Sequence, residues 1–483
     1  MKRIFLLLLV LTLVLVSCSK PKVEERLDVE TDPLYNDMYF VLIDDKWKLC
    51  DFEGHNVTEP IFDEVGDNFG FSLCPVKQNG KWGYITQTGE FIIEPRYEMA
   101  YGFDKNGCAL IFENGLYGIL GTNGQYILEP IYDSIGPVTN SRCIASSNGK
   151  YTVFNEIYEP VSEPLDYYMD FFYENGYATL YAGEGMKGCI NADGKIIVEP
   201  IYNELGRFAK NGLANFKLGD RRGYINTDGE IVLELEGCID AAEFHDNGLA
   251  RVVLEDGIYF INEKGEKVLG PYNNDTLINP YYFTKSGFCV VKSNETSLVG
   301  LMDKNGEMLT DFAYDIIMES SFPVEYPELL WISVDEKCGL MKDGKVILEP
   351  QFQFIDGFEE NGTAPYAVIE EDGDQKFGLI DLDGKILTDP IFDAVMRFSK
   401  KEFTVATLNG KDVFINKNGK VLPHEYDTIR DCGKNSFVFE TGNPVHYGVC
   451  DYEFNTIIST GENKIVLVKH EPFKYSVGAY TEN

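Results

Sequence analysis

Acidic side chains are the most abundant candidates for chemistry in this sequence, because 78 of its 483 residues are Asp or Glu. Two carboxylates held at a fixed separation can hydrolyse a glycosidic bond. With so many acids the sequence singles out no pair, and no segment stands apart chemically from the others. We therefore predict no catalytic residues. A hydrolase of envelope glycans, using carboxylates between residues 258 and 377, is kept as an alternative.

Other catalytic and ligand-forming residue types are scarce. The sequence has five histidines, and none forms an HExxH motif or another spacing suited to a metal ion. It contains neither a G-x-S-x-G nucleophile motif nor a phosphate-binding P-loop. We therefore predict no metal site and no cofactor.

One short stretch, "DLDG" at 381–384, resembles the start of a calcium-binding loop. A complete loop of this kind needs a glutamate at its twelfth position, counted from Asp381, and that position holds Phe392. Similar turns recur along the chain without the carboxylates. The stretch therefore predicts a hairpin turn, not a calcium site.

The N-terminus carries a different kind of chemistry. Two basic residues precede a short apolar run over residues 4–16, as in a secretory signal peptide. The run ends in "LVSC", which resembles the lipobox of bacterial lipoproteins. The resemblance implies a signal peptide over 1–17, a lipidated Cys18, a flexible tether over 18–37 and a place in the bacterial cell envelope, at the outer membrane or cell surface. An ordinary secretory peptide with an incidental cysteine is the alternative.

The net charge of the chain argues against one class of partner, the nucleic acids. The chain has 42 basic residues against its 78 acids, which gives a formal net charge of −36 at pH 7. Such a chain repels the phosphate backbone of nucleic acids. We therefore predict no nucleic-acid partner.

Ten further cysteines follow Cys18, and no C-x-x-C pair occurs. Four of them, residues 74, 108, 143 and 289, precede corresponding repeat positions by eight to ten residues. A free cysteine behaves as a small buried hydrophobe. We therefore predict core thiols, with disulfide bonds between neighbouring repeats as the alternative for an exported chain.

A phrase of about 35 residues recurs along the chain, with Trp82 as its most recognisable member. We call the twelve equivalent positions the anchors. They are Trp47, Trp82, Tyr117, Tyr151, Lys187, Arg222, Ile258, Val299, Cys338, Phe377, Asp412 and Tyr447. Self-similarity at such a period indicates a repeat architecture.

The regular positions around each anchor have structural explanations. A glycine follows the anchor in eight repeats, at Gly83, Gly118, Gly188, Gly223, Gly300, Gly339, Gly378 and Gly448. A residue without a side chain inside a strand suits close approach by another backbone or ring. A second glycine, such as Gly89, closes a hairpin turn. A proline, such as Pro95, cannot donate to a ladder and is predicted to end the next strand.

Each repeat is therefore predicted to be a three-stranded meander with an apolar face that it can bury only against its neighbours. Residues 38–43 and 464–469 both look like third strands, so neither end lacks a strand that the other must supply. We therefore predict an all-β chain of stacked repeats in an open solenoid. A ring of the β-propeller type, or two propellers, is the alternative.

These residues resemble the WG-repeat family over residues 38–470, although only Trp47 and Trp82 keep tryptophan at the anchor. The resemblance implies a β-rich scaffold without a common reaction. We expect a lipid-anchored, non-enzymatic scaffold that binds a protein or an envelope polymer, with a purely structural spacer as a further alternative. Residues 471–483 are predicted to form a cap strand or tail.

Overall fold

The computed structural model describes residues 38–468, except 52, 67, 273–277, 320–325, 372, 397–402, 433–435, 443, 452–455 and 462–463. The signal peptide, Cys18, the tether and the cap at 471–483 lie outside the described residues and stay predictions. Among the residues that are described, no helix is both long and apolar enough to cross a membrane.

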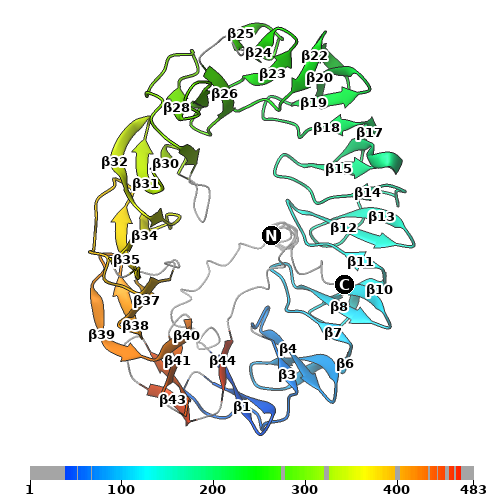
Figure 1. The fold of residues 1–483 in the computed structure, drawn as a ribbon. Helices are drawn as coiled ribbons and strands as arrows, with labels where there is room; N and C mark the ends of the chain where they lie inside the picture. Colours follow the sequence, from blue (N-terminus) through cyan, green and yellow to red (C-terminus); the bar gives the residue numbers. More distant parts are fainter. Residues whose placement is uncertain are drawn as a thin grey trace, which may run out of the picture.

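The described chain folds into twelve small antiparallel sheets, which we call blades 1 to 12 in chain order. The blades follow one another around a closed ring with a central opening (Figure 1). Each of the twelve anchors lies in a different blade. The prediction of an all-β chain built from tandem β-repeats is therefore confirmed.

The strands of the first six blades are as follows. Blade 1 contains β1 (Met38–Ile43), β2 (Lys46–Cys50) and β44 (Ile465–Val468); blade 2 contains β3 (Glu64–Val65), β4 (Leu73–Gln78), β5 (Lys81–Thr86) and β6 (Phe91–Tyr97); blade 3 contains β7 (Met99–Ala100), β8 (Cys108–Glu113), β9 (Leu116–Gly121) and β10 (Tyr126–Tyr132). Blade 4 contains β11 (Ser134–Ile135), β12 (Arg142–Ser147) and β13 (Lys150–Asn155); blade 5 contains β14 (Tyr168–Met169), β15 (Tyr177–Tyr181), the 3-10 turn η3 (Gly183–Gly185), β16 (Lys187–Asn191) and β17 (Ile196–Tyr202); blade 6 contains β18 (Glu204–Leu205), β19 (Leu213–Leu218), β20 (Arg221–Asn226) and β21 (Ile231–Glu234).

The strands of the other six blades are as follows. Blade 7 contains β22 (Cys238–Ala241), β23 (Ala250–Leu254), β24 (Gly257–Ile261) and β25 (Lys267–Tyr272); blade 8 contains β26 (Ile278–Phe283), β27 (Cys289–Ser293) and β28 (Val299–Met302); blade 9 contains β29 (Ile316–Glu319), β30 (Leu329–Val334), β31 (Lys337–Lys342) and β32 (Lys345–Phe352). Blade 10 contains β33 (Phe354–Ile355), β34 (Thr363–Ile369) and β35 (Gln375–Asp381); blade 11 contains β36 (Ala394–Val395), β37 (Phe403–Leu408), β38 (Lys411–Asn416) and β39 (Val421–Tyr426); blade 12 contains β40 (Thr428–Cys432), β41 (Ser436–Thr441), β42 (His446–Asp451) and β43 (Thr456–Gly461).

Blade 2 shows the plan of a repeat. The predicted three strands are β4, β5 and β6, and a fourth strand of two residues, β3, pairs with β4 through Glu64 and Val65. The outer strands, such as β6, β32 and β39, form the rim of the ring, while β26, β40 and β44 face the opening (Figure 1). The short strand is the residue pair after the corner, and it gives blade 2 and seven other blades one strand more than predicted, whereas blades 1, 4, 8 and 10 have three strands.

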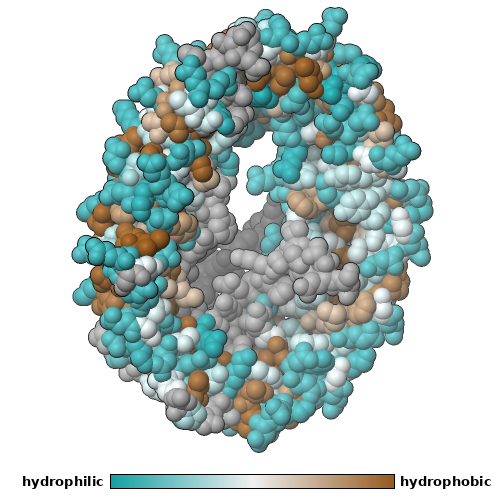
Figure 2. Space-filling view, in the orientation of Figure 1, coloured by the Kyte–Doolittle hydropathy of each residue, from teal (hydrophilic) through white to brown (hydrophobic). Residues whose placement is uncertain are grey.

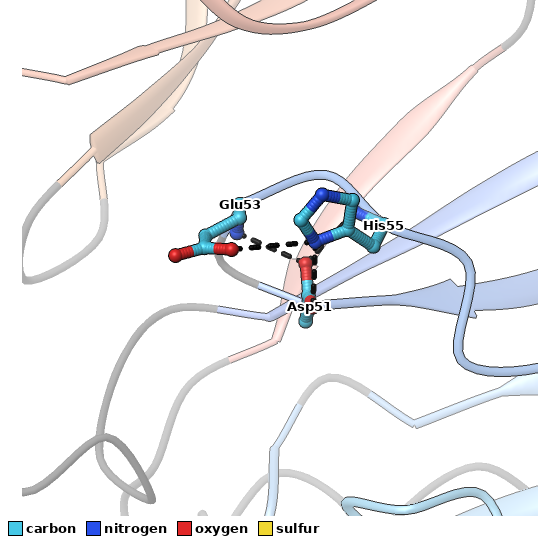
Figure 3. Close-up of side chains that lie close together, drawn as sticks. All are labelled: Asp51, Glu53 and His55. Atoms are coloured by element: carbon cyan, nitrogen blue, oxygen red, sulfur yellow. Dashed lines mark hydrogen bonds and ion pairs between the residues drawn. The ribbon is translucent and has the colours of Figure 1, made fainter.

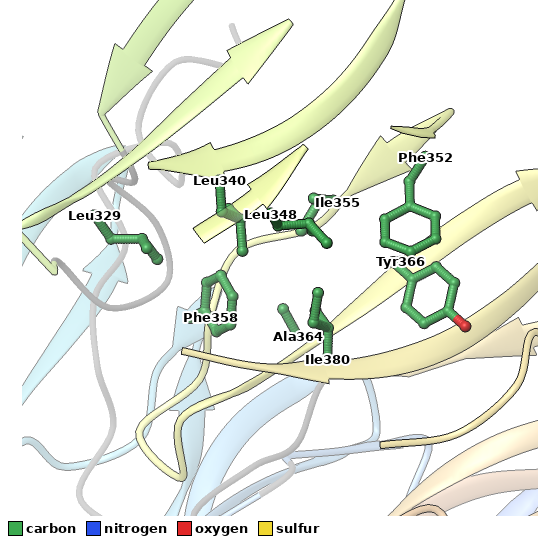
Figure 4. Close-up of a cluster of buried hydrophobic side chains, with 9 residues drawn as sticks. All are labelled: Leu329, Leu340, Leu348, Phe352, Ile355, Phe358, Ala364, Tyr366 and Ile380. Atoms are coloured by element: carbon green, nitrogen blue, oxygen red, sulfur yellow. The ribbon is translucent and has the colours of Figure 1, made fainter. Parts of the chain in front are cut away.

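The hydrophobic core is divided among the joints between blades. In the joint shown in Figure 4, leucines of blade 9 meet Phe358, Tyr366 and Ile380 of blade 10, and the side chains of this cluster are at most 8% exposed. Every joint that buries such a cluster removes apolar surface from water, which is the main source of stability. Because each blade shares its core with two neighbours, stability passes from neighbour to neighbour around the ring.

The ring corrects the preference for an open solenoid. Strand β44 pairs antiparallel with β1, from Met38 opposite Val468 to Val41 opposite Ile465. It occupies in blade 1 the place that β3 occupies in blade 2. The C-terminal strand therefore supplies the innermost strand that the N-terminal blade lacks, and this closes the ring. The sequence concealed this pairing because both segments look like ordinary third strands.

The role of the proline is also corrected. Pro95 does not end its strand but lies inside β6, where the register shifts between the pairs Trp82–Tyr97 and Tyr84–Ile93. The shift is a β-bulge in the outer edge strand, where a proline leaves no ladder donor unpaired. The bulge brings the backbone close to Gly83, because a Cβ there would overlap the carbonyl oxygen of Ile93 and lie 2.7 Å from the Pro95 nitrogen.

The same close approach to the outer strand recurs at four of the other anchor glycines, so in those blades the glycine and the bulge form one structural unit. Backbone atoms of the outer strand face Gly118, Gly188, Gly223 and Gly339, whereas Gly300 faces the Asp311 carbonyl and the Met308 side chain, and an aromatic ring faces Gly378 and Gly448. Gly89 has a φ of +80° in the next hairpin turn. A side chain at Gly83, Gly118, Gly188, Gly223 or Gly339 would force the outer strand away from the blade.

The cysteines are part of the core, as their spacing predicts. Of the nine whose side chains are described, eight are buried, Cys338 is partly buried and none forms a disulfide bond. Burial raises the pKa of Cys108 and of Cys289 to about 12. These thiols therefore stay protonated and serve as packing groups.

Candidate binding site

The anchor side chain lies at the joint with the following blade. Eleven of the twelve anchors are partly buried and Val299 is fully buried. Trp82 packs on a cluster that includes Tyr84, Tyr97 and Phe103, so one part of its ring belongs to the core. Core packing was the predicted role of the anchor aromatics. The rest of the ring remains accessible from outside.

Different anchors hold the next blade by different chemistry. The Tyr151 ring lies edge-on to Tyr168 of β14, with centroids 5.6 Å apart. Arg222 donates a hydrogen bond to the Cys238 carbonyl of β22 at 3.2 Å. Asp412 accepts one from the backbone amide of Ile429 in β40 at 2.9 Å. The position is therefore defined by its contact with the next blade and not by one residue type.

At Trp82 this joint opens into a groove of about 380 Å³. One wall is blade 2, through Gly66, Pro75 and Trp82, and the other is the chain entering and following β7 in blade 3, from Glu98 to Gly102. The Tyr84 hydroxyl donates to the Tyr101 carbonyl at 2.8 Å and fixes the two walls to each other. The groove is therefore a built feature of the joint between blades 2 and 3.

Small residues leave this space beside the tryptophan. Pro75 on β4 pairs with Tyr84 on the neighbouring strand β5. The position equivalent to Pro75 holds Leu110 in blade 3 and Asn215 in blade 6. Asn215 spans its joint and donates to the Ala241 carbonyl at 2.7 Å. The Pro75 side chain is shorter and has no donor, so it cannot make such a hydrogen bond across the joint. The sequence signal for the groove is therefore a tryptophan anchor together with Gly66 and Pro75, and sequence analysis missed it.

The charged groups at the groove are already paired. Lys77 Nζ lies 2.5 Å from a carboxylate oxygen of Glu64 and 5.9 Å from the Trp82 ring centroid. Lys81 Nζ lies 3.6 Å from a carboxylate oxygen of Glu98. The groove thus combines an aromatic surface with two ion pairs at its edge. Hydrophilic residues interrupted by separate apolar patches cover the face of the ring seen in Figure 2.

A second repeated feature of the joints escaped the sequence analysis. The pattern F-x-x-N-G occurs five times, and each phenylalanine is buried: Phe103, Phe172, Phe208, Phe244 and Phe358. Phe103 lies 4.9 Å from the ring of Tyr84 in the preceding blade, and Phe208 lies 4.7 Å from Tyr177. The asparagine can also cross the joint, since Asn106 and Asn175 donate to the Glu156 and Phe208 carbonyls.

The acidic residue of the corner caps the hairpin of the blade that follows. Asp63 accepts a hydrogen bond from the Gly80 amide at 3.0 Å and also pairs with Lys46 of blade 1. The same cap is made by Asp133, Asn203, Asp315, Asp393 and Asp427. The ion pair with Lys46 is the main reason that the pKa of Asp63 lies below its usual value.

An exposed group of Asp51, Glu53 and His55 has the donor types of a metal site (Figure 3). His55 Nδ1 lies 3.3 Å from Asp51 and 3.4 Å from Glu53. Asp51 also accepts the backbone amides of Glu53 and His55, at 3.0 and 2.8 Å. Asn191 and Asn226 accept equivalent amides in their own hairpins, so the group belongs to a turn that the repeat uses generally.

Asp381 and one carboxylate within residues 258–377 take part in the same kind of turn. Asp381 accepts the amides of Asp383 and Lys385, which confirms the predicted hairpin over "DLDG". Within 258–377, Asp303 accepts the amides of Asn305 and Glu307 at 2.9 and 2.8 Å. These bonds, above all that from Glu307, hold the pKa of Asp303 below its usual value.

The family comparison finds repeats where the structure has blades. The family described as "WG containing repeat" matches residues 51–82, 82–117, 117–151, 188–221, 223–257, 342–373 and 377–411. No curated protein matches this chain.

Three of the solved structures that match parts of this chain are as follows. A crystal structure of a eukaryotic initiation factor matches 77% of this chain and 98% of that chain, with 9% identity and a TM-score of 0.32. Hsv2p of Kluyveromyces lactis matches 50% and 92%, with 14% identity and a TM-score of 0.21. Dihydro-heme d1 dehydrogenase NirN, in complex with DHE, matches 61% and 75%, with 11% identity and a TM-score of 0.25. TM-scores this low carry no argument about function.

Proposed function

This chain belongs to the WG-repeat family, and we propose that it is a non-enzymatic binding scaffold of the bacterial cell envelope, held at a membrane by lipid on Cys18. One observation carries the proposal. The regular positions of the repeat hold the ring together, and a groove opens at a joint where the variable positions are small. Binding of a protein or an envelope polymer then falls to the residues that differ between repeats.

The shape of the molecule supports a binding role. A closed ring of blades presents a rigid surface, and binding residues held by rigid elements lose little conformational entropy when a ligand arrives. The net charge of −36 disfavours polyanionic ligands. Partners that are neutral or basic are therefore expected.

A pulldown from detergent-solubilised envelope, with the full chain as bait, tests the scaffold. We expect specific proteins or glycans to be retained and identified by mass spectrometry. Repeated failure to retain any partner, together with altered envelope integrity after deletion of the chain, would favour a purely structural spacer instead.

The lipid anchor has its own test. Acyl chains bind a membrane with about 0.8 kcal/mol per buried CH₂ group. We expect Cys18→Ser to block labelling by an alkyne-bearing fatty acid and to release the chain from the membrane fraction. A Cys18→Ser chain that is still labelled would exclude Cys18 as the anchor.

A further inference from the structure

We propose that the groove beside Trp82 is a subsite for one sugar ring of a neutral glycan. This inference rests on the binding function proposed above and gives it a ligand class. It also assigns Trp82 a second role, because the part of the indole that is not in the core lines the groove.

The surface of the groove suits a sugar ring. The flat C–H face of a pyranose packs against an aromatic ring, with a gain that comes from buried apolar area and dispersion. Trp82 supplies that ring, while Pro75 and Met99 add apolar surface beside it. A volume of about 380 Å³ accommodates a single sugar residue with its water.

The edge of the groove suits hydroxyl groups better than a charge. Glu64 and Glu98 accept hydrogen bonds and Lys77 donates them, so both partners of a hydroxyl are available. Each carboxylate already lies near a lysine, Glu64 near Lys77 and Glu98 near Lys81. A basic peptide would have to displace these lysines, and a polyanion would meet two carboxylates. An uncharged, hydroxyl-rich ligand needs neither change.

Comparison with other blades locates the subsite at this joint. Trp47 is the other tryptophan anchor, but it packs on the cluster of blades 1 and 2 and does not line the groove. Blade 3 carries Leu110 at the position of Pro75, and a leucine at 75 would project into the same space. A substitution at Trp47 is therefore a matched control for one at Trp82, and Pro75→Leu is a way to fill the groove.

The experiment is a titration of the purified full chain with neutral tetrasaccharides of glucose, galactose, mannose and N-acetylglucosamine, followed by calorimetry. We expect saturable binding of at least one of them. Both Trp82→Ala and Pro75→Leu should weaken it about tenfold or more, the loss expected for a central aromatic contact. Trp47→Ala should leave the affinity unchanged. Tetragalacturonate, an acidic tetrasaccharide, should not bind.

A second measurement leaves every residue that lines the groove unchanged. In a Trp47→Phe, Trp331→Phe chain, Trp82 is the single tryptophan, and the bound sugar should shift its fluorescence emission. Absence of binding by all four neutral tetrasaccharides, or equal binding by Trp82→Ala, would overturn the inference. Binding of a decaproline peptide in place of the sugars, with loss in Pro75→Leu, would assign the groove to peptides.

The two proposals fail separately. If the envelope pulldown retains the same partners with wild-type and Trp82→Ala bait while every neutral tetrasaccharide fails, the scaffold stands and the glycan subsite does not. The pulldown can also fail to retain any partner while a tetrasaccharide binds at Trp82. In that case the glycan subsite is supported and the wider scaffold is not.

Discussion

Blades 2 and 11 share a strand plan, yet they join to their neighbours by opposite chemistry. In blade 2 the anchor is Trp82, which packs against apolar side chains and lines a groove. In blade 11 the anchor is Asp412, which accepts hydrogen bonds at 2.9 Å from the Thr407 hydroxyl and from the Ile429 amide. The joint therefore requires a contact with the next inner strand and accepts either an apolar or a polar one.

The two blades also differ in how they place the bulge. In blade 2 the register shifts right after the anchor, and Gly83 receives the bulged backbone. In blade 11 the next residue is Val413, which still pairs in register with Glu425, and the shift comes after it. A side chain next to the anchor is thus compatible with the fold when the bulge moves along the strand.

Blade 7 shows a further arrangement. Its anchor is followed by Tyr259, and the glycine stands on the outer strand instead, at Gly270 with φ +110°. A Cβ on Gly270 would lie 2.6 Å from the Ile258 carbonyl oxygen. The close approach of the two strands therefore requires a glycine on one of them, and a repeat can place that glycine on either strand.

The largest expected effect is at Gly83. Gly83→Val should lower the free energy of unfolding by about 3 kcal/mol, because the side chain would overlap the backbone of Ile93 and Pro95. Urea unfolding followed by tryptophan fluorescence measures it. Gly183→Ala is the control, since no atom lies within 4 Å of a Cβ there. Equal stability of the two variants would show that the bulge in blade 2 moves as it does in blade 11.

A smaller effect is expected when blade 11 is given the anchor of blade 2. A substitution toward the family pattern usually stabilises a protein. Asp412→Trp should instead cost about 1–2 kcal/mol, because the Ile429 amide would lose its acceptor. Asp412→Asn keeps an acceptor oxygen and should cost less; urea unfolding of both variants measures the difference. A gain in stability from Asp412→Trp would mean that packing alone defines the joint.

The next effect concerns a feature common to both blades, the corner aspartates. Asp63 and Asp393 pair with lysines and cap the hairpins of blades 2 and 11, which lowers the pKa of both carboxyls. Because the folded pKa lies below the unfolded one, this stabilisation is present above about pH 4 and is lost as pH falls through the folded pKa. The effect is modest, since these pairs are near solvent.

Unfolding temperatures measured from pH 7 to pH 3 test this expectation. A chain with Asp63, Asp393 and Asp427 replaced by asparagine should lose less stability in acid than the wild type. Asparagine still caps the hairpin, as Asn203 does for Gly219 at 2.7 Å. An acid transition of unchanged steepness would place the titrating groups elsewhere.

The smallest effect is expected for a substitution that places a residue of blade 11 at the equivalent position of blade 2. Cys74 of blade 2 and Thr404 of blade 11 occupy matching positions, and Thr404 donates to the Met396 carbonyl at 3.1 Å. The Cys74 thiol faces the equivalent Gly66 carbonyl at 3.7 Å. Cys74→Thr should therefore change the free energy of unfolding by about 0.5 kcal/mol or less. Cys74→Val, which lacks the donor, should cost more.

The sequence predicts the repeat well because each blade is specified locally. The period, the alternating apolar residues of stretches such as residues 81–86 and the turn at Gly89 all lie within one repeat. Closure could not be predicted in this way, since β1 and β44 are separated by the whole ring and both carry the pattern of a third strand.

The groove was missed for a related reason. Its walls come from Gly66 and Pro75 in one blade and from Glu98 to Gly102 in the next. None of these residues is distinctive within its own repeat, and the space appears only when two blades face each other. A position-by-position comparison of each repeat with its neighbour would show which joints combine a tryptophan anchor with small facing residues.

The closing of the ring within blade 1 has a consequence for its circumference. The two strands of the closing pair, β1 and β44, flank the series of other described strands, and the closing contact is made within blade 1. Duplication of one internal repeat would therefore add a blade and leave the closure intact, provided that every joint turns slightly less. Loss of a repeat would tighten the ring in the same way. The size of the central opening is thus a quantity that unequal recombination can change in single steps.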